Sequence, residues 1–200
     1  MKKILHVISS PRGNASNSIQ LGNTIVDQLL AAHPGSTVKV RNLPEQNFPH
    51  LEEAHITSFF TPAERRTPEL VAAVKHSDEA IADIMDADII VIGVPIYNYS
   101  IHSTLKAWLD HIVRAGVTFK YEATGPKGLV HGKKMYIAMA SGGVLSEGNM
   151  KSLDFAEPYL RTIFGFIGIT DITVFRIEGL ALPELKDKAV EKGLASVMVA

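Results

Sequence analysis

Continuous apolar runs alternate along this chain with amphipathic segments of helical period. The clearest run is Ile89 to Val94, which contains no polar position. A run without alternation is typical of a strand that is buried on both faces, as in a parallel sheet covered by helices. Strands are expected at residues 4–8, 37–41, 88–94, 133–140 and 171–176, and helices at 18–32, 69–85, 102–115, 153–167 and 183–199.

Strands that alternate with helices imply parallel strands joined by right-handed crossovers. We therefore expect an α/β fold: a doubly wound, five-stranded parallel sheet of order 2-1-3-4-5, with helices on both faces. The whole chain, residues 1–200, is expected to form one domain. Residues 42–67 hold three prolines and are expected to be irregular, either as a lid or binding loop or as a surface excursion.

Three polar loops follow the first, third and fourth expected strands, at residues 9–18, 96–99 and 140–143. In the order 2-1-3-4-5 these three strands are neighbours, so their loops meet at one edge of the sheet. Ligands of open α/β sheets bind at this edge, outside the carboxyl ends of the strands. The sequence therefore predicts one site built from all three loops.

The first loop opens a helix, and helix N-termini suit a phosphate because they present unpaired N–H groups and a partial positive charge. Ser10, Ser16 and Ser18 are candidate hydroxyl donors, although serine is also a preferred N-cap. Arg12 either faces such a phosphate or extends into solvent. The loop is neither a Walker loop nor a G-x-G-x-x-G turn, so it indicates neither a nucleoside triphosphate nor a dinucleotide.

The other two loops suggest a flat ligand. Tyr97, Asn98 and Tyr99 favour a ring with polar edges, or alternatively the tyrosines cap the core. Gly142 and Gly143 let the backbone approach a ligand closely, or alternatively form an ordinary turn.

Composition excludes several other classes of protein. The hydrophobic fraction is 46% and the net charge is −1, with no basic stripe that would indicate nucleic acid. No cysteine is present, which excludes disulfides and thiol catalysis, and the dispersed histidines give no metal motif. No apolar run reaches the roughly 20 residues of a membrane span, and the first strand leaves no room for a signal peptide. A cytoplasmic protein without membrane or nucleic-acid partners is expected.

Several motifs occur together in a specific order and spacing. They are Ser10-Pro11-Arg12-Gly13 with Ser16 and Ser18, Pro95-Ile96-Tyr97-Asn98-Tyr99, Leu105-Lys106-x-Trp108-x-Asp110, and the segments 114–121, 125–134 and 164–169. Together they span nearly the whole chain and resemble the FMN-dependent NADH-azoreductase and quinone reductase family.

The resemblance implies a flavodoxin-like fold, non-covalent FMN, NADH or NADPH as electron donor, and a homodimer with two sites at its interface. It implies two-electron reduction of quinones and reductive cleavage of azo compounds by a ping-pong mechanism, in which the flavin and no side chain carries the chemistry. The family's flavin contacts correspond here to Ser10, Ser16, Asn17, Ser18, Ile96, Tyr97, Asn98, Tyr99, Ala140, Ser141, Gly142 and Gly143.

Four further points stay open at this stage. Phe119, Tyr121 and residues 45–67 are candidate walls of the substrate pocket, with core packing as the competing interpretation for Phe119. Trp108 lies either in the core or in a subunit contact. Ser141 stands where relatives often have Arg. The competing functions are an NAD(P)H-dependent FMN reductase that releases its flavin and a flavodoxin-like electron carrier, a class that is usually more acidic than this chain.

Overall fold

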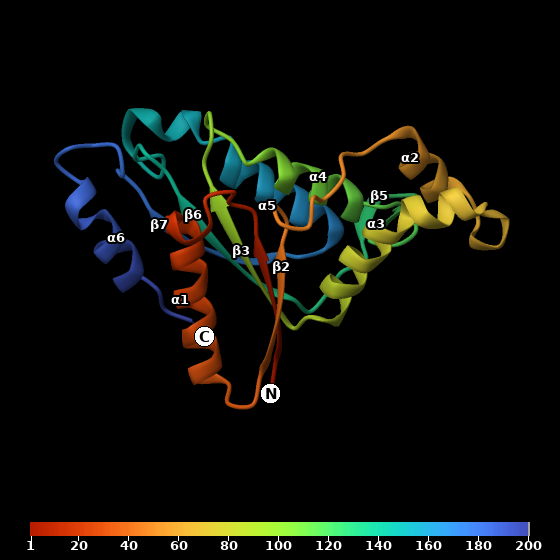
Figure 1. The fold of residues 1–200 in the computed structure, drawn as a ribbon, viewed down its shortest axis with the longest axis horizontal. Coiled ribbons are helices and arrows are strands. Elements are labelled where there is room, and N and C mark those ends of the chain that lie inside the picture. The colour runs from red at the N-terminus through yellow and green to blue at the C-terminus, as the bar shows by residue number, and fades with distance from the viewer. Residues whose placement is uncertain (200) are drawn as a thin grey trace.

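The computed structural model describes residues 1–199 and places five parallel strands in one sheet and two more strands in a separate antiparallel hairpin (Figure 1). The sheet strands are β1 (Lys3–Ile8), β2 (Thr37–Asn42), β3 (Ile89–Pro95), β6 (Lys134–Ala140) and β7 (Asp171–Ile177), and the hairpin strands are β4 (Phe119–Glu122) and β5 (Gly125–Gly128). The sheet order is β2-β1-β3-β6-β7, and each neighbouring pair is parallel.

The expected order 2-1-3-4-5 did not include the hairpin of β4 and β5. The hairpin lies between the third and fourth sheet strands along the chain, yet it pairs with neither. Strand β5 has the sequence Gly-Pro-Lys-Gly, which lacks the apolar alternation that predicts a strand. It forms because its backbone pairs with β4, in the register Phe119 to Gly128.

Helices α1 (Asn17–Ala32) and α6 (Lys186–Ala195) lie on one side of the sheet. Helices α3 (Pro68–Asp86), α4 (Ser103–Ile112) and α5 (Ala156–Ile167) lie on the other side (Figure 1). Within residues 1–199, no helix combines the length and the apolar character of a membrane span.

Strand β3 is the centre of the core. All seven of its residues are buried, between β1 on one side and β6 on the other. Ile89 and Val91 pack with α1 and α6, whereas Ile90 and Ile92 pack with α3, α4 and α5. The unbroken apolar run of the sequence is therefore explained by a strand with a helix layer on each face.

The expectation that residues 42–67 are irregular is wrong in part. Helix α2 (Glu53–Phe60) lies within this stretch and is followed by a short 3-10 turn, Ala63–Arg65. The backbone N–H of Glu52 donates to Nδ1 of His55 at 2.9 Å, which completes a capping box at the start of the helix. A capping box normally has Glu or Gln at the position of His55, so the sequence pattern did not reveal it.

Three expected helices are shorter in the structure. Helix α4 ends at Ile112, because the side chain of Thr118 accepts the backbone N–H of Arg114 at 2.9 Å and donates to the carbonyl of Ile112 at 2.6 Å. Helix α5 begins at Ala156, where Asp154 caps its first amides, after a 3-10 stretch over Gly148–Leu153. Helix α6 covers only the middle of the expected segment 183–199.

The open question about Trp108 is settled by its burial. Its side chain is fully buried on α4, and its ring centroid lies 6.5 Å from that of Phe164 on α5. Trp108 therefore belongs to the core of the single chain and is not a subunit contact.

Two histidines are buried with the core. His6 on β1 is 3% exposed, and burial lowers its pKa to about 4. His111 on α4 is fully buried, with the ring of His55 at 4.7 Å between centroids. Burial, with the nearby charges of His55 and His76, lowers the pKa of His111 to about 4 as well. Both side chains are therefore neutral in the folded protein near neutral pH.

These two histidines predict acid destabilisation. Their ordinary pKa is 6.5, so below that pH the unfolded chain binds protons that the folded chain does not. The free energy of unfolding should therefore fall as the pH drops from about 6.5 to about 4, by roughly 2 kcal/mol for each histidine at about pH 5. Urea unfolding at neutral and mildly acidic pH measures this, and His111→Leu should remove about half of the histidine contribution. Equal pH dependence in wild type and His111→Leu would contradict a neutral, buried His111.

Candidate functional site

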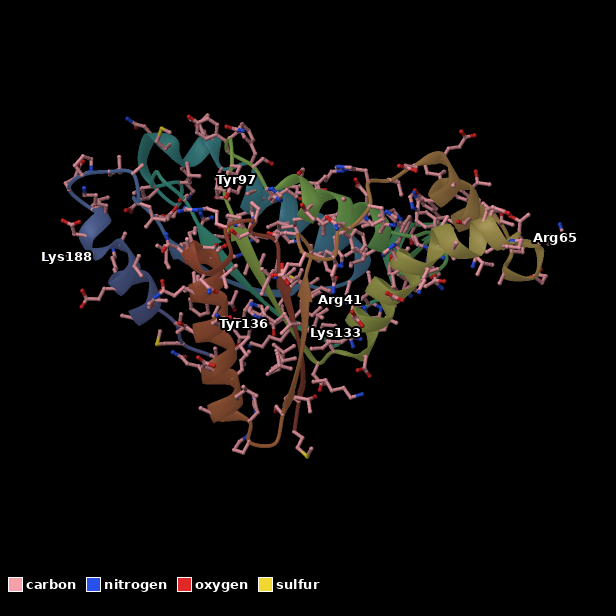
Figure 2. All side chains as sticks on the ribbon, viewed as in Figure 1. Arg41, Arg65, Tyr97, Lys133, Tyr136 and Lys188 are labelled. Carbon is pink, nitrogen blue, oxygen red and sulfur yellow. The ribbon has the colours of Figure 1, made fainter. Side chains whose placement is uncertain are left out.

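A cavity of about 390 Å³ lies at the carboxyl ends of β1, β3 and β6. Figure 2 shows Tyr97 at this end of the sheet and Lys133 at the opposite end. The cavity is lined by side chains and backbone from four segments of the chain: Ser10, Arg12, Ser16, Asn17, Ser18, Pro95, Ile96, Tyr97, Ala140, Ser141, Gly142, Leu180 and Ala181. This is where an open α/β sheet binds its ligand.

The first wall is the loop from β1 to α1. Ser16 is the N-cap of α1, and its Oγ accepts the backbone N–H of Ile19 at 3.4 Å. The same oxygen lies 3.0 Å from Oγ of Ser18. The amides of Asn17 and Ser18 stand in the first turn, where a helix offers them no internal acceptor. Ser16 is therefore a cap, and its neighbourhood is also a cluster of donors suited to an anion.

Arg12 adds positive charge to this wall. Its side chain is exposed to solvent and also lines the cavity. The two alternatives, facing a phosphate and extending into solvent, are therefore compatible. Arg12 is the one charged side chain among the described residues that line the cavity. The electrostatics of the cavity therefore favour a negatively charged group near the start of α1.

The second wall is the loop after β3. Ile96 donates its backbone N–H to the carbonyl of Ala140 at 2.8 Å, which continues the β3–β6 pairing into the loop. Tyr97 and Ser100 exchange two backbone hydrogen bonds of 3.0 Å around a two-residue turn. Its central residues are Asn98 and Tyr99, with φ of 50° and 67°. Such turns favour glycine at the second central position, so Tyr99 is held in a strained conformation, as functional residues often are.

The third wall is the loop after β6. The N–H of Ser141 donates to the carbonyl of Ile177 at 3.0 Å, and that of Ala181 donates to Gly142 at 2.9 Å. The hydroxyl of Ser141 donates to the carbonyl of Gly143 at 2.8 Å. A Cβ at Gly142 would lie 3.2 Å from that of Ala181, closer than an ordinary contact. Glycine at this position therefore lets the loop pack against the segment that follows β7.

The structure brings most of the expected flavin contacts together around this cavity. Asn98, Tyr99 and Gly143 do not line it. Asn98 faces a second hollow of about 610 Å³ beside the start of α4, and Tyr99 is 46% exposed. All three residues still set the path of the backbone that carries their neighbours to the cavity.

The two candidate substrate residues lie on the hairpin and not in the cavity. Phe119 is 7% exposed and packs against Phe166 at 4.5 Å between ring centroids, so the competing interpretation, core packing, describes it. Tyr121 is 74% exposed and contacts Phe119 at 5.4 Å between centroids. Of the two, Tyr121 alone presents an aromatic surface to a partner or ligand.

Sequence reasoning missed Leu180 and Ala181, which line the cavity from the segment after β7. The signal was available, because the fifth expected strand ends beside the fourth and its following loop must reach the same edge. Gly179, with φ of 79°, turns the chain at that point.

The lining residues define the chemistry of the cavity. Serine hydroxyls, the amides of the helix start and Arg12 suit an anionic group, while Pro95, Ile96, Leu180 and Ala181 form an apolar surface for a flat ring. No carboxylate or imidazole lines the cavity among the described residues. The same part of the chain, residues 1–199, has no cluster of three His, Asp or Glu suited to a metal ion.

Comparisons with known proteins place this geometry in a family. A family model described as a flavodoxin-like fold matches residues 2–199. The FMN-dependent NADH:quinone oxidoreductase of Herminiimonas arsenicoxydans is 47% identical over 195 residues, which is 98% of this chain and 94% of the relative. That of Aromatoleum aromaticum is 48% identical over 179 residues, covering 90% of this chain and 88% of the relative.

Solved structures agree with these relatives. An azoreductase from Bacillus anthracis superposes with a TM-score of 0.90 at 31% identity, covering 98% of this chain and 96% of its own. An FMN-dependent NADH-azoreductase from the same species, solved in complex with FMN, gives 0.86 at 25% identity, covering 98% and 97%. The resemblance found in the motifs is confirmed, and the chain belongs to the Flavodoxin_2 family, which has a flavodoxin-like fold.

Proposed function

We propose that this protein is an FMN-dependent NADH:quinone oxidoreductase that also reduces azo compounds. One observation carries the proposal: the same cavity is lined by the start of α1, which suits an anion, and by an apolar wall beside Tyr97 and Gly142. The names of the similar proteins, FMN-dependent NADH:quinone oxidoreductase and azoreductase, support the same activity.

The residues present fit FMN. Ser10, Ser16, Asn17 and Ser18 would hold its phosphate through hydroxyls and first-turn amides, beside Arg12. The ring would lie on the second and third walls. In the third wall, the missing side chain of Gly142 lets the backbone pack closely against Ala181. No cysteine or histidine lines the cavity among the described residues, so non-covalent binding is proposed.

When bound, FMN supplies two-electron chemistry, taking a hydride from NADH or NADPH and passing two electrons to the acceptor. The chain's own residues bind, orient and shield. The strained turn at Tyr99 fixes Tyr97, and the pairing of residues 141–143 with the segment after β7 fixes the opposite wall. Since no carboxylate or imidazole of residues 1–199 lines the cavity, we propose that no side chain acts as an obligatory proton donor.

We further propose a homodimer. Large aromatic side chains are exposed on separate segments, among them Phe60 at 77%, Tyr121 at 74% and Phe155 at 56%. Exposed aromatic side chains of this size are enriched at interfaces. In the proposed dimer, Tyr121 and α2 form acceptor-pocket walls, and Phe119 supports Tyr121 from behind.

The direct test of the proposed function is cofactor analysis followed by kinetics. The purified protein should carry, or take up, one FMN per chain, bind FAD poorly because it lacks a dinucleotide turn, and reduce a quinone with NADH. One crevice serves donor and acceptor in turn. Double-reciprocal plots of initial rate against NADH concentration, measured at several quinone concentrations, should therefore be parallel. Intersecting plots would contradict the ping-pong order. Turnover that needs free FMN in solution would instead indicate a flavin reductase. Reduction of the bound flavin without turnover of a quinone would indicate an electron carrier.

The phosphate site is tested by the double variant Ser16→Ala/Ser18→Ala. Hydrogen bonds to a charged group are worth about 1.5–3 kcal/mol, so FMN affinity should fall at least roughly tenfold in titrations of the stripped protein. Thr67→Ala is the matched control, because Thr67 caps α3 in the same way but lies outside the cavity. It should cost similar stability and leave FMN affinity unchanged. Equal affinity in all three proteins would reduce the two serines to helix caps.

Tyr99→Gly tests whether the strained turn serves the site. Glycine relieves the positive φ, so stability should stay constant or rise by about 0.5 kcal/mol. The looser turn should bind FMN roughly threefold more weakly, because ordering it costs backbone entropy. Asn47→Gly, which relieves a φ of 47° in another loop, should leave FMN affinity unchanged. Tighter FMN binding by Tyr99→Gly would contradict the proposed role of the turn.

A further inference from the structure

Arg176, on the edge strand β7, is held by three carboxylates. Its side chain is only 12% exposed. Nη2 pairs with Asp154 Oδ2 at 2.6 Å and with Glu157, and Nη1 pairs with Glu178 Oε1 at 3.2 Å. A planar guanidinium has enough donors, in a fixed fork, to serve several acceptors at once.

Arg176 is the main positive charge in this cluster. Asp154 and Glu178 are 7% and 13% exposed, so water screens them poorly. Burial, the largest influence, raises the pKa of Glu157, yet hydrogen bonds and charges of Arg176 and Arg161 hold it below its ordinary value. Of the three carboxylates, Arg161 pairs with Glu157, at 2.7 Å; it also donates to the carbonyl of Ile172 on β7 at 3.1 Å, and its side chain is 44% exposed.

The Glu178 side of the network reaches the third wall of the cavity. Oε1 of Glu178 accepts the backbone N–H groups of Leu145 and Ser146, at 2.8 and 3.0 Å. Oε2 accepts the hydroxyl of Ser146 at 2.5 Å. Leu145 is separated from Gly143 by Val144 alone, so Glu178 fixes the far end of that loop.

The Asp154 side of the network reaches the second wall. Oδ1 of Asp154 accepts the backbone N–H groups of Ala156 and Glu157, both at 3.0 Å, and so anchors the start of α5. The N–H of Phe155, between Asp154 and Ala156, is shared by the carbonyls of Leu153 at 3.1 Å and Tyr99 at 3.3 Å. The turn that presents Tyr97 is therefore tied to the same ion network.

We propose that Arg176 is a positioning residue for the flavin: it couples the loop after β3 and the loop after β6, so that both walls hold the ring together. The inference rests on the proposed FMN-dependent function. It assigns a role to a side chain that does not line the cavity and acts through Glu178 and Asp154.

Three variants separate coupling from general destabilisation. Arg176→Gln removes the shared cation. Glu178→Ala removes the pair with Arg176 and the connection to residues 145–146, and leaves the pair of Arg176 with Asp154 in place. Arg161→Gln is the matched control, because it removes an arginine from the same cluster without touching either loop. Should Arg176→Gln fail to fold, Arg176→Lys keeps the charge but cannot reach Asp154 and Glu178 with one planar fork.

Amide hydrogen exchange on the purified proteins measures the coupling between the loop after β3 and the loop after β6. Arg176→Gln should speed exchange about tenfold in both segments, 97–103 and 141–148. Glu178→Ala should do so in 141–148 only, and Arg161→Gln in neither. Faster exchange spread evenly over the chain, including the buried turns of α1, would show that Arg176 is merely structural and would overturn the proposal.

FMN titration of the stripped proteins, followed by flavin fluorescence and the visible spectrum, reads the effect on the ring. Arg176→Gln should weaken FMN about tenfold and alter the spectrum of bound flavin, while Arg161→Gln should match wild type. Unchanged affinity and spectrum in Arg176→Gln, with wild type binding FMN, would overturn the inference and leave the function standing. Absence of FMN binding by wild type would contradict the proposed function, and the exchange pattern would then decide the coupling.

Discussion

The parallel pairing of β3 with β1 on one side and β6 on the other is the constraint on which the site depends. Parallel pairing makes the three strands end at the same edge, and helices on both faces exclude water from β3. The three following loops have no other place to lie than around one crevice. A substitution that disturbed β3 would therefore affect every wall of the site together.

Backbone N–H and C=O groups at this edge need hydrogen-bond partners beyond the ends of the strands. The hydrogen bonds that they form give the loops of the site their shape. Ser16 satisfies the start of α1, the bond from Ile96 to Ala140 extends β3, and residues 141–143 pair with the segment after β7. The amides of Asn17 and Ser18, in the first turn of α1, have no acceptor within the helix and are available to a ligand. The strained turn at Tyr99 is stabilised in the same way, by the backbone hydrogen bonds between Tyr97 and Ser100 on either side of it.

The sequence predicted the features that depend on local pattern and chain order. The apolar run of β3, the Ser16 cap and the three loops all follow from periodicity and from the edge rule for parallel sheets. Features that depend on unusual local partners were not predictable. Helix α2 has His55 in its capping box, and β5 has a polar glycine-rich sequence. Arg176 pairs with Glu178 on its own segment and with Asp154, 22 residues earlier in the chain. Phe119 shows the same limit, since its burial depends on Phe166.

The central claim is that the three loops together form one FMN site, and the crystal structure of the FMN-loaded protein tests it most directly. The account predicts phosphate oxygens within hydrogen-bonding distance of Ser16, Ser18 and the first amides of α1, with the ring between Tyr97 and Gly142. Flavin density elsewhere, for instance in the hollow of about 380 Å³ between α6 and the end of β7, would contradict it.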